Sequence, residues 1–168
     1  MDAAAFETLL RQEMGLNAAS IGSASVERAV QDRMQACMLT SAEAYWQHLQ
    51  AAQGELQKLI EAVVVPETWF FRDREAFAAL ASLARDEWLP AHPQGAFRVL
   101  SLPCSTGEEP YTMAMALLDG SLSADRFVID ALDISERSLG VARRGLYGRN
   151  SFRGGDIAFR DRYFAATA

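Results

Sequence analysis

The sequence predicts an α/β protein in which a helical N-terminal domain precedes the first part of a doubly wound parallel sheet. Two observations support this prediction. Apolar residues recur at helical spacing through residues 3–65, whereas two compact β-type runs, FRVLSL and FVIDALDI, alternate with helical patterns after residue 96. With 168 residues, half of them hydrophobic, the chain can bury the core of one domain or of two small ones.

The first half of the chain is expected to be entirely helical. Phe6, Leu9 and Leu10 follow a helical period within residues 3–14, and Gly15 ends the pattern. A second pattern, SASVERAVQDRMQACML, offers Ser25 as a helix cap. Ser41 is a candidate cap for the pattern that follows, and Pro66 ends the last helical run of this half.

A long alanine-rich amphipathic pattern, REAFAALASLARDEWLPAHPQG, connects the two halves and is closed by prolines and a glycine. We therefore expect three parts: a helical N-terminal domain over residues 1–75, a connecting helix and linker over residues 76–95, and a partial α/β domain over residues 96–168.

The α/β part reads strand, helix, strand, helix. Pro110 is tolerated in the first turn of the first helix, and Ser135 is a candidate cap for the second. This order implies parallel strands joined by right-handed crossovers, as in a Rossmann-like sheet. Only two strands are evident, and two parallel strands cannot bury both faces of a sheet. The sequence therefore predicts an incomplete domain.

Composition excludes several classes of protein. A net charge of −6 disfavours a nucleic-acid binder, which needs a basic surface. Cys37 and Cys104 are too few and too far apart for a disulfide framework or a paired metal motif, so we expect no metal site and a reducing compartment. The N-terminus is acidic and no apolar run is long enough for a membrane span, which predicts a cytoplasmic protein with no membrane insertion.

The loop LPCSTGEE follows the first strand, at the edge of the sheet where ligands bind in this architecture. Gly107 permits a close approach of the backbone, and the helix that starts near Glu108 offers free N–H groups. Glu108 and Glu109 would repel a pyrophosphate but attract a cationic or hydroxyl-bearing ligand. A dinucleotide, which also requires more glycines, is therefore disfavoured.

Asp133 ends the second strand, at the position where an acid commonly accepts hydrogen bonds from ribose hydroxyls. A positively charged nucleoside without phosphate describes S-adenosylmethionine. This pattern alone leaves two alternatives open, a nucleotide-dependent oxidoreductase and an α/β domain without such a ligand.

Three segments occur in a characteristic order: TWFFRDREAF, SLPCSTGEEPYTMA and DALDISERSLGVARRGLY. With them the chain resembles the CheR-type chemoreceptor glutamate O-methyltransferases, and most of all their Wsp surface-sensing branch. The resemblance implies methyl esterification of glutamate side chains on a methyl-accepting, chemoreceptor-like signalling protein. S-adenosylmethionine would be the methyl donor and S-adenosylhomocysteine the product.

The resemblance also implies site residues. Thr68 and Arg72 match cofactor-contacting positions, Glu108 matches the acid that binds the methionine amino end, and Asp133 matches the ribose acid. A carboxylate is already a nucleophile at pH 7, so alignment matters more than a general base. Arg72 could provide this alignment by a bidentate contact with substrate or cofactor, which makes it the candidate catalytic residue.

Each of these residues also has a simpler interpretation. Arg72 could be an ordinary surface arginine, and Thr68 could cap the turn after Pro66. Glu108 could merely favour the positive end of a helix dipole. Cys104 lies in the same loop, but no histidine is near it in sequence, which disfavours a nucleophilic role.

The chain departs from the family pattern at two places. Pro66 stands where many members have an asparagine, and the C-terminal sequence lacks the later N-x-x-I-Y-F segment and the small β-subdomain. We therefore expect a chain that is truncated at its C-terminal end and inactive alone. The alternative function is a non-catalytic signalling interaction module, and the sequence leaves open the receptor, its glutamates and the oligomeric state.

Overall fold

The computed structural model describes residues 3–15 and 22–167. The chain forms two compact units, Met1–Val65 and Pro66–Ala168, and each unit is considered by itself. The two units divide between Val65 and Pro66, whereas the sequence predicts that the helical domain ends at residue 75; Phe70 packs into the core of the second unit. The predicted connecting segment, residues 76–95, also lies within the second unit.

The first unit is a bundle of helices. Its elements are α1 (Ala3–Met14), α3 (Ser23–Ala36), α4 (Ala42–Ala51) and α5 (Glu55–Val63). Helix α3 packs against both α1 and α5, and α4 packs against α5. One apolar core joins the four helices, and its buried members are Phe6, Leu10, Val26, Ala29, Val30, Tyr45, Leu49, Leu59, Ile60 and Val63.

The helix ends of this unit test the capping predictions. Ser41 caps α4, because its Oγ accepts a hydrogen bond from the Ala44 N–H over 3.2 Å. The prediction that Ser25 caps α3 is wrong, since this helix begins at Ser23 and Gly22 precedes it. Met38, which lies within the helical pattern SASVERAVQDRMQACML, is beyond the end of α3 and is 90% exposed.

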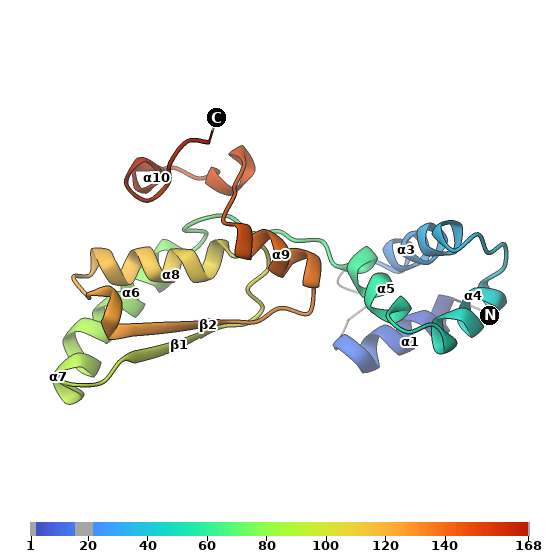
Figure 1. Ribbon diagram of the computed structural model, residues 1–168, viewed down its shortest axis with the longest axis horizontal. Coiled ribbons are helices and arrows are strands. Elements are labelled where there is room, and N and C mark those ends of the chain that lie inside the picture. Colours follow the sequence, from blue (N-terminus) through green and yellow to red (C-terminus); the bar gives the residue numbers. More distant parts are fainter. Residues whose placement is uncertain (1–2, 16–21, 168) are drawn as a thin grey trace. The chain divides into compact units, whose positions relative to one another are not determined.

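The second unit contains both strands and the other helices of the described residues (Figure 1). In chain order they are α6 (Arg74–Ser82), a π-helical turn (Leu83–Trp88), α7 (Leu89–Ala91), β1 (Phe97–Ser101), α8 (Glu108–Asp119), a 3₁₀ turn (Ala124–Arg126), β2 (Phe127–Ala131), α9 (Glu136–Arg144), a second 3₁₀ turn (Arg149–Phe152) and α10 (Ala158–Tyr163). Strands β1 and β2 pair in parallel, with Phe97 opposite Phe127. The predicted α/β class is confirmed.

The two faces of the strand pair differ. Phe97 and Val99 of β1, with Ile129 of β2, turn toward the core formed with α8 and the helical run from α6 to α7. Figure 1 shows α6 and α8 together over the strands. The alternate residues face outward, and among them Leu100 and Val128 remain 53% and 42% exposed. One face of the sheet is therefore packed and the other is bare within this unit.

An aromatic cluster forms a separate core in the second unit. Its buried centre consists of Phe70, Met115 and Phe159. Phe70 contacts Tyr147, Phe152, Phe159 and Phe164, with ring centroids 4.8 to 5.9 Å apart. Because Phe70 and Phe159 come from distant parts of the chain, this cluster holds the segment before α6 against the segment after α9.

Candidate functional site

The loop between β1 and α8 is tightly enclosed at Gly107. This residue has φ +97°, and a Cβ atom there would lie 2.7 Å from both the Ala142 Cβ and the Tyr147 Oη. The Tyr147 hydroxyl also donates a hydrogen bond to the Thr106 carbonyl over 2.9 Å. The chain itself therefore approaches Gly107, so glycine is required here even before any ligand is considered.

Glu108 is the first residue of α8 and is buried, with 2% of its surface exposed. Its Oε2 accepts a hydrogen bond from the Thr106 hydroxyl over 2.6 Å, and its Oε1 accepts one from the Ser151 hydroxyl over 2.7 Å. Each carboxylate oxygen can accept a further hydrogen bond. Two hydroxyl donors thus fix the orientation of a buried carboxylate that keeps acceptor capacity.

Glu109 has a different environment from its neighbour. Its Oε1 accepts a hydrogen bond from the Ser101 hydroxyl over 2.7 Å, and Ser101 is fully buried at the end of β1. This bond ties the start of α8 to the strand that precedes it.

Asp133 follows β2 and connects the two loops at the carboxyl ends of the strands. Its Oδ2 accepts a hydrogen bond from the Ser105 N–H over 2.7 Å, and its Oδ1 accepts one from the Ser135 N–H over 2.8 Å. Ser135 in turn caps α9, as predicted, through its Oγ and the Ser138 N–H. Backbone groups therefore hold the Asp133 carboxylate in place, and its remaining lone pairs are available to hydroxyl groups.

Thr68 and Arg72 lie in the segment before α6. Thr68 is half-buried and Arg72 is exposed. The Arg72 guanidinium donates a hydrogen bond to the Glu67 carbonyl over 2.8 Å and lies 4.6 Å from the centroid of the Trp69 ring. Arg153 lies 4.2 Å from the same ring and 3.7 Å from the Glu67 carboxylate. Cation–π contacts therefore order the side chain of Arg72 at the surface.

Two backbone hydrogen bonds attach this segment to the rest of the unit. The Phe70 N–H donates to the Ser151 carbonyl over 2.9 Å, and the Phe71 N–H donates to the Thr112 hydroxyl over 3.2 Å. The Thr112 hydroxyl itself donates to the Glu108 carbonyl over 2.6 Å. Glu108 is therefore linked to the segment that contains Arg72 in two ways, once through Ser151 and once through Thr112.

The four predicted site residues are not joined to one another by polar interactions in the part of the chain that the structure describes. Within residues 3–15 and 22–167, no hydrogen bond or ion pair joins any two of Thr68, Arg72, Glu108 and Asp133. Ser151 is the residue that sequence reasoning missed. It bonds to both Glu108 and the Phe70 backbone, but its own sequence context, RNSFRG, contains no pattern that indicates such a role.

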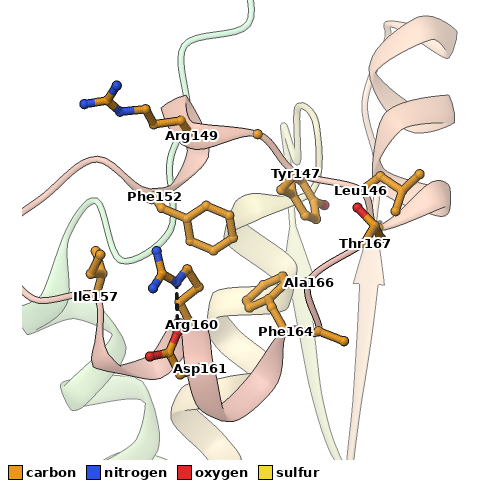
Figure 2. Close-up of a pocket in the computed structure, with 13 residues that line it drawn as sticks. Leu146, Tyr147, Arg149, Phe152, Ile157, Arg160, Asp161, Phe164, Ala166 and Thr167 are labelled. Atoms are coloured by element: carbon orange, nitrogen blue, oxygen red, sulfur yellow. Dashed lines mark hydrogen bonds and ion pairs between the residues drawn. The ribbon is translucent and has the colours of Figure 1, made fainter.

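Two cavities lie within the second unit. The larger, about 790 Å³, opens between the end of α9 and α10 and has Tyr147, Phe152 and Phe164 in its wall (Figure 2). Arg160 also lines it, but its Nε is paired with Asp161 over 2.9 Å. The smaller, about 390 Å³, lies between α8 and α9 and includes Cys104. Neither cavity is lined by any of the four predicted site residues.

The cysteines do not form a second reactive site. Burial and the charge of Asp133 raise the pKa of Cys104, which disfavours the thiolate. Cys37 lies with His48 and Glu55 in a group whose ligand atoms are all within 4.8 Å of one another. However, the Arg33 guanidinium binds both Glu55 oxygens at 2.9 and 3.0 Å. The Arg33 guanidinium therefore already supplies the positive charge at Glu55 that a metal ion would otherwise provide.

Taken together, the segments that follow β1 and β2 bring two oriented carboxylates, those of Glu108 and Asp133, to the carboxyl ends of parallel strands. Two carboxylates with remaining acceptor capacity fit a ligand that carries a positive charge and hydroxyl groups, such as S-adenosylmethionine. They do not fit a pyrophosphate. These features define the beginning of an α/β nucleoside-binding domain with a helical unit before it.

The chain belongs to the CheR methyltransferase family. Residues 1–64 match the family model described as the CheR methyltransferase all-alpha domain, and residues 66–168 match the one described as its SAM binding domain. The predicted family and cofactor class are therefore confirmed.

Several curated relatives are similar to this chain. It is 56% identical to the probable biofilm formation methyltransferase WspC of Pseudomonas aeruginosa and 48% identical to that of Pseudomonas putida, over 97% and 96% of its length. It is 33% identical to the chemotaxis protein methyltransferase of Escherichia coli over 93% of its length. The chain spans only 39%, 38% and 54% of these relatives, respectively.

None of the helices in the described residues has the length and apolarity needed to cross a membrane.

Proposed function

We propose that this chain is part of an enzyme that transfers a methyl group from S-adenosylmethionine to glutamate side chains of a chemoreceptor-like signalling protein in the cytoplasm. The family membership of both units supports this proposal. The names of the relatives, which include biofilm formation and chemotaxis methyltransferases, support a role in signalling.

In this proposal, residues 96–168 supply half of the cofactor site. Glu108 binds the ammonium group of the amino-acid portion, because it is an oriented carboxylate with unused acceptor capacity. Asp133 accepts hydrogen bonds from the ribose hydroxyls. The observation that carries the proposal is that both acids lie at the carboxyl-end edge of the parallel strands, Glu108 at the start of α8 and Asp133 in the loop after β2, where this architecture binds its ligands.

Thr68 and Arg72 complete the proposed set from the segment before α6. When bound, S-adenosylmethionine supplies an electrophilic methyl group on a positively charged sulfur. Arg72 carries a permanent positive charge on an exposed guanidinium, which suits it to orient the carboxylate of a substrate or cofactor. Substitution by lysine would keep the charge but lose the bidentate geometry.

Calorimetric titration with S-adenosylhomocysteine tests the proposal. We expect wild-type binding, and a loss of at least about tenfold in affinity for Glu108→Ala and for Asp133→Ala, which is the effect of one charged hydrogen bond. Asp130→Ala is the matched control, since this exposed acid near the end of β2 pairs with Arg98 on the outer face of the sheet.

The outcomes separate the competing functions. Selective binding of a nicotinamide dinucleotide would indicate an oxidoreductase and contradict the proposal. If neither ligand binds, the chain acts without this cofactor, as a non-catalytic interaction module would.

A further inference from the structure

We propose that Ser151 is a positioning residue for recognition of the ligand's amino-acid end, because its hydroxyl orients the Glu108 carboxylate. This inference rests on the proposed function and deepens it by assigning a task to a residue outside the predicted motifs. Ser151 does not itself touch the ligand in this proposal; it acts through Glu108.

The position of Ser151 is fixed from three sides. Its carbonyl accepts the hydrogen bond from the Phe70 N–H over 2.9 Å, and its own N–H donates to the Gly148 carbonyl over 3.1 Å. The next residue, Phe152, packs against Phe70 and Phe159 in the aromatic cluster. The backbone of Ser151 is therefore anchored, and its hydroxyl is held 2.7 Å from the Glu108 Oε1.

The Ser151 hydroxyl is one of only two side-chain donors to Glu108 in the described residues, the other being that of Thr106. Thr106 is next to Glu108 in its own loop, whereas Ser151 approaches from a segment 43 residues away. Without the Ser151 hydroxyl, Oε1 would be a buried acceptor with no partner, and the carboxylate could turn about its last torsion angle. An ammonium group would then meet an acceptor that is no longer oriented.

The other end of the site does not depend on Ser151. Asp133 is held by the backbone N–H groups of Ser105 and Ser135, and neither bond involves the segment around Ser151. Loss of the Ser151 hydroxyl should therefore weaken recognition of the ammonium group and leave recognition of the nucleoside unchanged. A merely structural role would weaken both together.

Two ligands that differ in the amino-acid portion separate these roles. S-adenosylhomocysteine carries the amino acid, and methylthioadenosine has the same nucleoside and sulfur without it. We expect Ser151→Ala to weaken binding of S-adenosylhomocysteine about tenfold and to leave binding of methylthioadenosine within about twofold. Ser151→Thr, which retains a hydroxyl, should restore most of the affinity. Ser82→Ala on the exposed surface of α6 is the control.

Calorimetry with both ligands decides the inference. Equal weakening of the two ligands by Ser151→Ala, or no weakening of either, would overturn it. Failure of the proposed function gives a different result. The wild-type chain would then bind neither S-adenosylhomocysteine nor methylthioadenosine, or Glu108→Ala would leave the ratio of the two affinities unchanged. In either case the inference would fall with the proposed function.

Discussion

The backbone N–H of Ser105 donates a hydrogen bond to the Oδ2 of Asp133 over 2.7 Å. This contact joins the loop after β1 to the loop after β2, and the second oxygen of the same carboxylate holds the Ser135 N–H at the start of α9. Asp133 therefore has a structural task in the free protein, in addition to the ligand contact that we propose for it.

Asp133→Asn should destabilise the second unit without any ligand. The amide has one carbonyl oxygen, so one of the two N–H groups loses its acceptor, at a cost of about 1–3 kcal/mol. Urea unfolding of the ligand-free chain measures this change. Asp130→Asn should cost less than about 1 kcal/mol, because it removes only a surface ion pair with Arg98. Equal effects of the two substitutions would contradict the structural role of Asp133.

Gly107→Ala should destabilise the protein by at least about 2 kcal/mol, since it combines backbone strain with overpacking. Its Cβ would lie 2.7 Å from both Ala142 and Tyr147. Thermal unfolding measures the effect. Gly148→Ala is the control, because no atom lies within 4 Å of its Cβ position and its φ is −91°. A Gly107→Ala variant as stable as this control would show that the loop adapts easily.

The first unit should lose stability in acid through Glu55. Burial raises the pKa of this carboxyl, but the hydrogen bond and charge of Arg33 outweigh burial and hold the pKa below its usual value. A carboxyl with a lowered folded-state pKa stabilises the fold above its unfolded pKa of about 4.3, and this contribution disappears as the pH falls through the folded value. Urea unfolding between neutral and acidic pH should show a flatter dependence for Glu55→Gln.

Two further variants define the Glu55 experiment. Arg33→Ala should cost about 3–5 kcal/mol at neutral pH, because it leaves the buried Glu55 carboxylate without its main partner. Glu13→Gln, on the exposed side of α1, should keep the wild-type pH dependence. If Glu55→Gln and the wild type respond to acid in the same way, another group controls acid stability.

Tyr163 should contribute to stability below alkaline pH. Burial first, and then the hydrogen bond to Asp119, raise the pKa of Tyr163 to about 12. The contribution is therefore complete below the ordinary tyrosine pKa of about 10 and is lost as the pH rises through about 12. Tyr163→Phe should cost about 0.5–1.5 kcal/mol at neutral pH, since its hydroxyl donates to the Asp119 carboxylate over 2.5 Å at a site that solvent partly screens.

Tyr111→Phe is the matched control for Tyr163. The Tyr111 hydroxyl is exposed and donates to an uncharged group, the Ala142 carbonyl, over 3.1 Å. Urea unfolding at neutral and alkaline pH should show a smaller loss for this variant and an alkaline dependence like that of the wild type. An equal response of the two variants would mean that the bond to Asp119 is not stabilising.

Local patterns predicted much of the fold. The α/β class, the caps at Ser41 and Ser135 and the helix start at Glu108 all follow from residue type and spacing over a few positions. The cap at Ser25 failed because several consecutive small residues offer alternative starts to the same helix. The π-helical turn after α6 was also not predicted, since apolar periodicity does not distinguish it from an ordinary helix.

The contacts of the candidate site were less predictable. Glu108 and Asp133 could be singled out because both lie just after predicted parallel strands, where this architecture binds its ligands, and because both match family motifs. The bond between Glu108 and Ser151 spans 43 residues and depends on how Phe70 and Phe152 pack, which no local pattern encodes. The contacts of the Arg72 and Arg153 guanidinium groups with the Trp69 ring were likewise not predictable, because they depend on how distant segments pack. The roles of Thr68, Arg72, Glu108 and Asp133 toward the cofactor stay predictions.

The bare face of the strand pair has a consequence for how the second unit behaves in solution. Four apolar side chains on or beside the strands, Leu100, Leu102, Val128 and Leu132, are between 42% and 61% exposed. Covering such a surface lowers the free energy because it releases ordered water, so molecules that carry it attract one another. Residues 66–168 carry 14 acidic and 12 basic residues, so the net charge of −2 on this unit opposes the attraction only weakly. Light scattering by the isolated second unit should therefore rise more steeply with protein concentration than that by the isolated helical unit, which carries 8 acidic and 4 basic residues.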